Sequence, residues 1–398
     1  MNKNKLLIGC SSVLALSLLL AAVAGYFIYQ RFARFFSMIH TEMPAELKQP
    51  RVIAGQELLE KASFLQVKRL GRISSILYGK FDPSLDSELC IVGQTGALFL
   101  DEQGNQKDSV TFAKAVETVL GFKAEGTNRR YGQIDVVDVD GDHIYEFLVR
   151  ENLNGAAELI GHDGKTIWTY DEGDGENSFL EDMTAGDIDG DGKAEYVAAY
   201  LNGKGLVLLD HSRKEIWSKP EVHANTVQML DTDGSGKLKI LHDAYTQIVL
   251  RDTSGNVLSG GETGNYIGHF SLVRWPSKKD RQYALHFSHD VTRLLDYNGK
   301  TVKEFNAPLS KDLYRVHGIT VKLKAEGPEY FAAVAESIVY ERSVFYVYNS
   351  TGSLVYQEIL PEAYESIAAF PLGLSGREAI LLGGDGEVIE YKMNDPAR

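Results

Sequence analysis

A repeated strand–turn–strand pattern constrains the fold of this chain more than any other feature. Its clearest copies are Leu159–Trp168 and Leu206–Trp217, each with two apolar strands around a polar turn. Weaker copies occupy residues 98–105, 248–258, 294–302 and 345–355. β-Branched and aromatic residues suit pleated strands, and Gly or Asn supplies the positive φ of a tight turn. Each copy therefore predicts a β-hairpin.

Two more strands precede each hairpin. The nearer strand of each unit begins close to Glu88, Glu146, Glu195, Leu238, Gln282, Glu329 and Glu378. Seven units of four strands therefore fit between residues 62 and 398, with a period of roughly 40 to 60 residues. A radial array of such sheets buries each blade against its neighbours. We expect an all-β, seven-bladed β-propeller of four-stranded blades; a solenoid, which shares the period but not the four-strand unit, is the alternative.

The last unit is one strand short. Only six residues follow its final strand, Glu387–Lys392. We therefore expect Ser63–Lys68 to supply the missing outer strand and to close the ring.

The N-terminal segment is a membrane-anchor candidate. Residues 6–29 carry no charge and are long enough to cross a hydrocarbon core of roughly 30 Å as a helix. Ala22–Ala24 could be a signal-peptidase site, but the apolar run continues to Tyr29, which favours an uncleaved anchor over residues 1–30. We expect a single-pass protein of the cell membrane with its propeller on the extracytoplasmic side.

A juxtamembrane stalk is expected over residues 31–61. Pro44 and Pro50 interrupt this segment, and residues 55–61 have the mixed pattern of a short helix. We expect the stalk to carry no chemistry.

Two acidic loops stand between the first and second strands of their units. Each has carboxylates at positions 1, 3, 5 and 9 and a residue at position 7 that can offer its backbone carbonyl. Calcium takes six to eight such oxygens at about 2.3–2.6 Å, and without a cation the clustered carboxylates repel one another. The predicted ligands of structural Ca²⁺ are Asp138, Asp140, Asp142, Ile144 (carbonyl) and Glu146, and Asp187, Asp189, Asp191, Lys193 (carbonyl) and Glu195.

A third loop has the same form but a weaker ligand set. It begins Asp231-Thr-Asp233-Gly and has Ser235 at position 5 and Lys239 at position 9. We expect that site to be weak or empty. For all three loops the alternative is a plain Asp/Gly turn with solvated charges.

The acidic loops within this repeat resemble those of the FG-GAP and VCBS family of β-propellers, which includes the integrin α-subunit head. The match is good over residues 130–240 and rests on strand pattern elsewhere. The resemblance implies a seven-bladed propeller with calcium in the loops of one face, used for adhesion and binding. The first unit and the last three lack the acidic loop, so calcium is not expected there. The Lys-x-x-Trp turns ending at Trp168 and Trp217 resemble those of quinoprotein-type propellers, which implies that both tryptophans dock between blades.

Composition and motifs restrict the classes of function that this chain can have. A formal net charge of -14 without long basic runs argues against a nucleic-acid partner. No nucleophile–base motif, P-loop or zinc-hydrolase motif occurs in the sequence. We expect a binding or scaffolding module for a protein or glycan rather than an enzyme. The alternative is a quinone-cofactor dehydrogenase or a polysaccharide-active enzyme. A cluster of His, Arg and paired carboxylates in the central channel would favour this enzyme alternative.

Overall fold

The computed structural model describes residues 43–81, 88–116, 132–151, 156–170, 180–200, 203–276, 278–288, 291–313, 315–337 and 340–394. The chain divides into two compact units, residues 1–48 and residues 49–398. The described part of the first unit holds one 3-10 helix, η1 (Ala45–Leu47). The expected anchor over residues 1–30 lies outside the described residues. Within the described residues, no helix has the length and apolarity to span a membrane.

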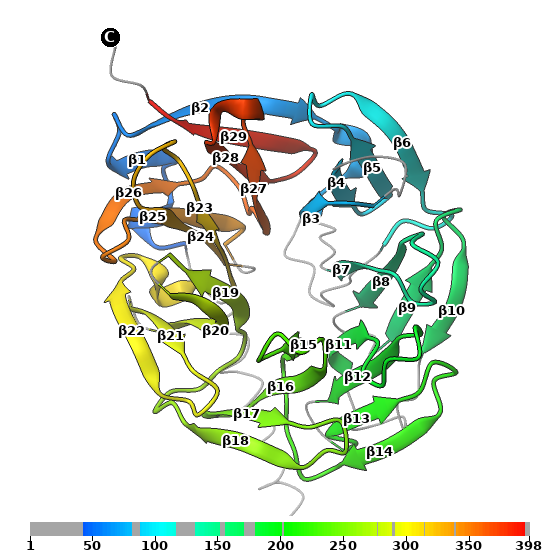
Figure 1. Ribbon diagram of the computed structural model, residues 1–398. Coiled ribbons are helices and arrows are strands. Elements are labelled where there is room, and N and C mark those ends of the chain that lie inside the picture. Colours follow the sequence, from blue (N-terminus) through cyan, green and yellow to red (C-terminus); the bar gives the residue numbers. More distant parts are fainter. Residues whose placement is uncertain are drawn as a thin grey trace, which may run out of the picture. The chain divides into compact units, whose positions relative to one another are not determined.

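The described part of the second unit forms seven antiparallel sheets arranged in a ring (Figure 1). We number them as blades 1 to 7. Blade 1 is β3 (Ile73–Gly79), β4 (Glu88–Gly93), β5 (Gly96–Leu100) and β6 (Gln106–Thr111). Blade 2 is β7 (Gly132–Val137), β8 (Glu146–Glu151), β9 (Ala156–Ile160) and β10 (Thr166–Tyr170). Blade 3 is β11 (Leu180–Gly186), β12 (Glu195–Tyr200), β13 (Leu206–Leu209) and β14 (Glu215–Lys219). Blade 4 is β15 (Val227–Asp231), β16 (Leu238–Ala244), β17 (Gln247–Arg251) and β18 (Val257–Glu262).

The remaining blades complete the ring. Blade 5 is β19 (Ser271–Trp275), β20 (Lys278–Ser288), β21 (Val291–Leu295) and β22 (Thr301–Asn306). Blade 6 is β23 (Arg315–Val321), β24 (Tyr330–Ser337), β25 (Arg342–Tyr348) and β26 (Leu354–Ile359), joined by β1 (Arg51–Ala54). Blade 7 is β27 (Ser366–Pro371), β28 (Glu378–Gly383) and β29 (Glu387–Met393), joined by β2 (Leu59–Gln66). Short 3-10 helices are η2 (Lys68–Leu70), η3 (Ser310–Asp312) and η4 (Gly373–Ser375). The expected seven-bladed, all-β propeller of four-stranded blades is confirmed.

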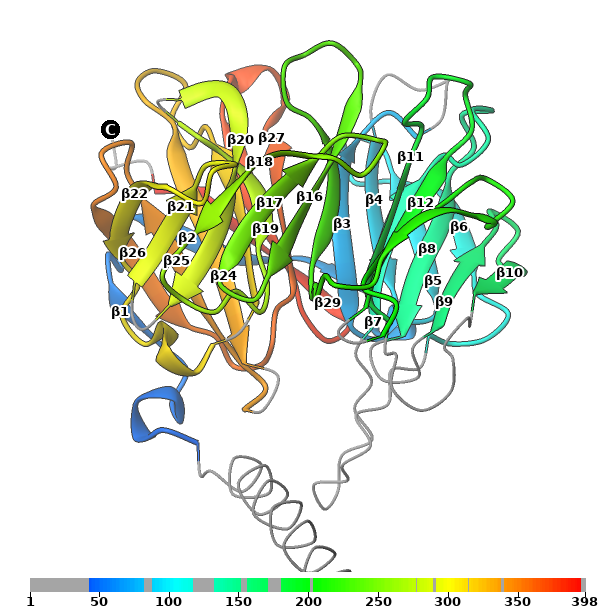
Figure 2. The ribbon, with the colours of Figure 1, turned by 90° about the horizontal axis from the view of Figure 1, so that it is seen from below.

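The first strand of each blade as numbered lies at the centre of the ring, and the rim is formed by the fourth strand in blades 1 to 5, by β1 in blade 6 and by β2 in blade 7 (Figure 1). Because consecutive strands are antiparallel, the chain enters each blade from the same end, and the seven inner strands run in one direction (Figure 2). The starts of the inner strands therefore meet at one end of the channel, and the turns that follow them emerge at the other end.

The predicted closure of the ring by an N-terminal strand is confirmed, although the strand is Leu59–Gln66 rather than the expected Ser63–Lys68. β2 pairs with β29 along its whole length, with Leu59 opposite Met393 and Gln66 opposite Glu387. The short helix expected over residues 55–61 does not form. A turn closed by Leu58 N–H and the Gly55 carbonyl precedes β2, and Leu59 is buried at the start of the strand. Pairing with β29 satisfies the backbone and outweighs the local helical pattern.

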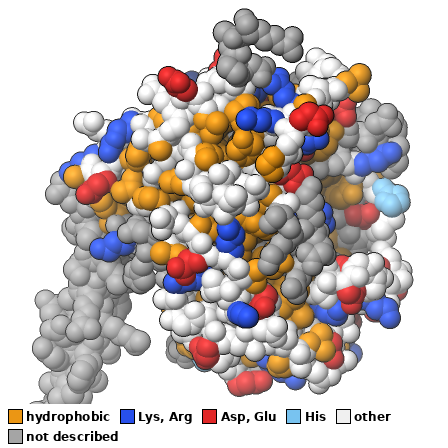
Figure 3. Space-filling view, turned by 60° about the vertical axis from the view of Figure 1, so that its left-hand side comes forward, with side chains coloured by type: hydrophobic (Ala, Val, Ile, Leu, Met, Phe, Trp, Pro, Cys, Tyr) orange, Lys and Arg blue, Asp and Glu red, His pale blue; other side chains and the backbone are white. Residues whose placement is uncertain are grey.

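A fifth strand covers the rim of blade 6. β1 pairs antiparallel with β26, with Arg51 opposite Ile359. The sheets therefore begin at Arg51, inside the segment expected to be a stalk. On this side of the ring, hydrophobic, basic and acidic side chains are interspersed over the surface (Figure 3).

The predicted docking of two tryptophans between blades is confirmed. The ring of Trp168 in blade 2 packs edge-on against Tyr196 of blade 3, with 5.2 Å between the ring centroids. The indole N–H of Trp217 in blade 3 donates to the Thr253 carbonyl of blade 4 at 2.9 Å. Each tryptophan thus joins its blade to the next one along the chain.

Candidate functional site

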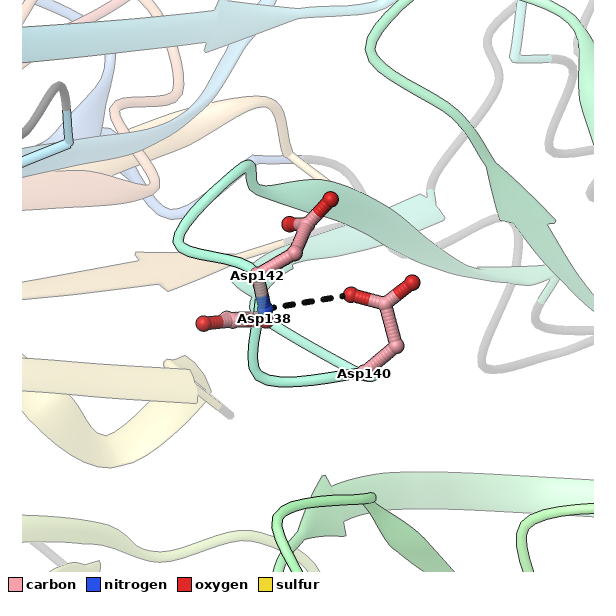
Figure 4. A group of neighbouring side chains, drawn as sticks. All are labelled: Asp138, Asp140 and Asp142. Carbon is pink, nitrogen blue, oxygen red and sulfur yellow. Dashed lines mark hydrogen bonds between the residues drawn. The ribbon is translucent and has the colours of Figure 1, made fainter.

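The first acidic loop joins β7 to β8 and is held by its own backbone. Asp138 accepts hydrogen bonds from the N–H groups of Gly141 at 2.8 Å and His143 at 3.1 Å. Asp140 accepts from Asp142 N–H at 3.3 Å, the bond drawn in Figure 4. His143 has a φ of 68°, so it adopts the left-handed conformation that glycine takes at this position in the other loops. These bonds gather the loop into one tight turn.

The second acidic loop, between β11 and β12, repeats this arrangement. Asp187 accepts from Gly190 N–H at 2.7 Å and Gly192 N–H at 2.9 Å, and Asp189 accepts from Asp191 N–H at 3.0 Å. The two loops thus share one hydrogen-bonding pattern, in phase with the repeat.

Both loops bring carboxylate oxygens close enough for one ion. One oxygen from each of Asp138, Asp140 and Asp142 lies within 4.8 Å of the others, and the same holds for Asp187, Asp189 and Glu195. Figure 4 shows the first three carboxylates around a single turn of the chain. An all-oxygen set of this kind suits a hard cation such as Ca²⁺. The predicted carbonyl ligands, Ile144 and Lys193, belong to the same loops, and their role stays a prediction.

The glutamate at position 9 is buried at the base of each loop. Glu146 accepts from Val139 N–H at 3.2 Å, and Glu195 accepts from Ile188 N–H at 3.1 Å. Burial, reinforced by the three neighbouring aspartates, raises the pKa of Glu146 to about 7. Burial and the aspartates of its own loop also raise the pKa of Glu195. The ionised form of each glutamate is thus disfavoured in the absence of a cation.

The two acidic loops touch each other. Ala194 N–H donates to the Val139 carbonyl at 2.8 Å, which ties the second loop to the first. A Cβ added at Gly141 would lie 2.6 Å from the carbonyl oxygen of Gly192, so only glycine fits there. The two acidic loops therefore lie side by side at the end of the ring where the inner strands finish.

In the third acidic loop, in blade 4, a lysine side chain pairs with one of the aspartates. Its backbone repeats the pattern, with Gly234 and Gly236 donating to Asp231 at 2.8 and 2.7 Å. Here, however, the Lys239 ammonium lies 2.8 Å from Asp233, and this contact lowers the pKa of Asp233 below its usual range. The lysine partly neutralises the loop, and the expectation of a weak or empty site there stays a prediction.

A second group of charged residues lies in the central channel, where sequence analysis named no residues. Arg150 of β8 lies 2.7 Å from Asp182 of blade 3 and 3.1 Å from Asp135 of its own blade. Arg72, just before β3, lies 2.8 Å from Glu336 of blade 6 and also pairs with Glu365. Each arginine thus crosses from one blade to another inside the ring.

Burial is the largest cause of the pKa shifts of several charged and imidazole groups in the channel. It raises the pKa values of Glu181 and Asp182 and lowers that of Arg315. It also lowers the pKa of His317 to about 4 and holds that of His269 well below its usual range. Both imidazoles are therefore neutral at pH 7. This convergence of His, Arg and paired carboxylates is the feature expected from the sequence to favour the enzyme alternative, and it comes from residues that are far apart in sequence.

Comparison with known proteins supports the fold and no finer assignment. No family model matches the chain, and no curated protein matches it in sequence. Among solved structures, BBS1N in complex with ARL6DN matches with a TM-score of 0.52 and 9% identity over 85% of this chain and 98% of that chain. A streptogramin B lyase structure matches with a TM-score of 0.50 and 10% identity over 85% of this chain and 99% of that chain. Virginiamycin B lyase from Staphylococcus aureus gives a TM-score of 0.50 and 10% identity over 84% of this chain and 99% of that chain. These propellers include both binding proteins and enzymes, so likeness of fold does not choose between the two roles.

Proposed function

We propose that this chain is a calcium-stabilised β-propeller that acts as a binding or scaffolding module for a protein or glycan. In the proposal, Ca²⁺ is structural and occupies the loops of blades 2 and 3. The N-terminal segment tethers the propeller to the cell membrane on its extracytoplasmic side, where free calcium suits sites of modest affinity. The two connected acidic loops then form one rigid corner of the binding face.

The comparison between the three acidic loops carries the proposal. All three share one backbone hydrogen-bonding pattern, and among the described residues only the loop of blade 4 has a lysine, Lys239, paired with one of its aspartates. In the described structure, no Lys or Arg pairs with Asp140 or Asp189 in the other two loops. In those two loops a bound cation would supply the positive charge that the Lys239 ammonium supplies in blade 4.

A binding role is proposed over a catalytic one because the channel arginines are held in ion pairs with carboxylates of other blades and of their own. Arg150 pairs with two carboxylates, and so does Arg72. Groups committed to such pairs brace the blades and are poorly placed to transfer protons during a reaction.

Thermal unfolding in calcium and in chelator tests the proposal. The midpoint for the wild-type chain should rise in calcium, because an ion that binds only the folded state adds to its stability. The double variant Asp140→Ala/Asp189→Ala should lose this rise, whereas Asp233→Ala in the lysine-neutralised loop should keep it. Equal midpoints in calcium and chelator for the wild-type chain would refute structural calcium.

A further inference from the structure

A groove with a volume of about 510 Å³ runs along one face of blade 4. Its walls come from β16, β17 and β18 and from residues 221–223, in the segment that links blade 3 to blade 4. None of the described residues that line it belongs to an acidic loop. Pockets for small ligands have volumes of about 300–1,000 Å³, so the groove is large enough for such a ligand.

Arg251, at the end of β17, gives the groove a buried positive charge, with only 9% of the residue exposed. In other blades the pairing of the third strand with the fourth shifts in register at the same place, and the residue there is apolar and buried. The corresponding residues are Leu100, Ile160, Leu209 and Leu295. A buried charge is costly unless a partner compensates for it. An arginine at a core position of the repeat therefore indicates a role other than packing.

The guanidinium of Arg251 is fixed in place but has no counter-ion. Its Nε donates to Nε2 of His242 at 2.9 Å, and its Nη1 donates to the Gly255 carbonyl at 2.9 Å. Its Nη2 makes no hydrogen bond to the described residues and keeps contact with solvent. Burial lowers the pKa of Arg251, and Glu221, which forms no ion pair with it, opposes this shift. The guanidinium can therefore bind an anion that enters the groove.

The other end of the groove is acidic. Glu262 is exposed and accepts hydrogen bonds from Thr246 and Gln247, both at 2.6 Å. These bonds hold the pKa of Glu262 below its usual range, so the side chain is ionised at pH 7. Gln247 and Arg251 are the first and last residues of β17. At about 3.3 Å per residue, roughly 13 Å separates the two ends of this strand.

Apolar and small residues line the groove between these charges. Val222 and Val249 are buried in its walls. Tyr245 borders it in the left-handed conformation, with a φ of 57°, and its ring centroid lies 5.1 Å from that of His223. Such backbone strain is concentrated at functional sites. Gly260 pairs with Val249 and leaves the groove open, whereas other blades carry a side chain at this position: Ser109, Thr169, Ser218 and Glu304.

The charges of the groove select the class of ligand. A simple anion would be attracted by Arg251 but repelled by the exposed carboxylates of Glu221 and Glu262. A simple cation would leave the guanidinium without a counter-ion. A zwitterion with well-separated charges suits both ends. An extended tripeptide has its terminal charges roughly 10 Å apart, because each residue spans about 3.3–3.6 Å.

We propose that the groove of blade 4 binds an extended peptide of about three residues through its two free termini, the carboxylate on Arg251 and the ammonium on Glu262. The planar guanidinium suits a carboxylate, since two parallel hydrogen bonds can form. Apolar side chains of the peptide lie against Val222 and Val249. This site goes beyond the proposed protein or glycan partner, and it does not depend on calcium.

Calorimetric titration of the purified chain with defined peptides tests the proposal. The probes are trialanine and trivaline with free termini, their C-terminal amides and their N-acetyl forms, with acetate as a simple anion. At least one free tripeptide should bind, and blocking either terminus should weaken its binding about tenfold. Binding should persist in chelator at temperatures where the chain stays folded, so failure of this site and failure of structural calcium give separate results.

Two variants locate the binding, and a third is the control. Arg251→Leu gives blade 4 the leucine of blades 1, 3 and 5, and should bind the free and amidated peptides equally weakly. Glu262→Gln should weaken binding of the free tripeptide about tenfold and leave binding of its N-acetyl form unchanged. This change is at an exposed side chain, so it tests the site even if Arg251→Leu does not fold. Arg293→Leu removes an arginine of blade 5 that pairs with Glu304, and should bind tripeptide as the wild type does.

Three results would overturn the proposal. The first is that neither free tripeptide binds at millimolar concentrations. The second is that acetate, the amides or the N-acetyl forms bind as tightly as the free tripeptides. The third is that a free tripeptide binds but Glu262→Gln, and Arg251→Leu where it folds by circular dichroism, bind it as tightly as the wild type.

Discussion

Nη1 of Arg150 lies 2.7 Å from Oδ1 of Asp182, and this buried ion pair joins blade 2 to blade 3 inside the ring. The other oxygen of Asp182 accepts from Val227 N–H at 2.9 Å, so the same carboxylate also holds the start of blade 4. One pair of side chains therefore connects three consecutive blades.

Removing one partner of this pair should destabilise the propeller strongly. Arg150→Met leaves Asp182 buried without its counter-charge, which typically costs about 3–5 kcal/mol. A large drop in the thermal midpoint is expected. The matched control, Lys165→Met, breaks the exposed Lys165–Asp163 pair and should leave the midpoint unchanged. Equal midpoints for the Arg150 variant and the control would show that the channel pair does not brace the blades.

The lysine-neutralised loop of blade 4 should be convertible into a calcium site. The double change Ser235→Asp/Lys239→Glu gives this loop the carboxylates at positions 5 and 9 that the other loops have. Without the lysine the carboxylates repel one another, so the variant should be less stable than the wild type in chelator and gain more from calcium. Thermal midpoints in both conditions measure the two effects. A calcium-dependent rise no larger than that of the wild type would contradict the assigned role of Lys239.

Closure of the ring through β2 should contribute substantially to stability. Leu59→Ala empties a buried position at the start of this strand, and such changes cost about 2–5 kcal/mol. Leu258→Ala on the outer strand of blade 4 is the control, because Leu258 is half exposed. Denaturant unfolding should separate the two variants clearly. Similar behaviour would mean that the β2–β29 closure matters little for folding.

Acid should destabilise the calcium-loaded protein between pH 6.5 and 4. Burial lowers the pKa values of His242, His286 and His317 to about 4. In this pH window the unfolded chain therefore binds protons that the folded chain does not bind. Stability from these histidines is complete above pH 6.5 and is lost as the pH falls. Burial raises the pKa of Asp243 to about 6, so the folded chain takes up a proton there as the pH falls. This uptake offsets the loss of stability from roughly one histidine.

The slope of stability against pH gives the test. His242→Gln should flatten it by up to about 1.4 kcal/mol per pH unit, the amount for one proton. A steeper slope for the His242 variant would contradict the assignment of a neutral buried imidazole.

The strand framework was predictable because each blade repeats a local pattern. The expected second strands at Glu146, Glu195 and Glu378 are those of the structure, since an apolar run after a polar turn marks each one. Residues 51–61 were not predictable from local pattern. β1 and β2 owe their conformation to pairing with β26 and β29, about 300 residues away.

The acidic loops and the channel site also differ in how well the sequence predicts them. The acidic loops are contiguous in sequence, so their spacing reveals them. The channel site combines residues near the starts of inner strands, such as Arg72, with residues near the ends of second strands, such as Glu336, and only closure of the ring brings them together. A charged residue beside an apolar strand was the available signal, and by itself it does not tell which partner it will meet.

Counting calcium ions bound to the purified chain at equilibrium tests the central claim most directly. We expect two ions per wild-type chain, one in Asp189→Ala and none in Asp140→Ala/Asp189→Ala, with both variants folded by circular dichroism. A wild-type chain that binds no calcium, or a double variant that still binds two ions, would contradict the assignment of the acidic loops of blades 2 and 3 as calcium sites.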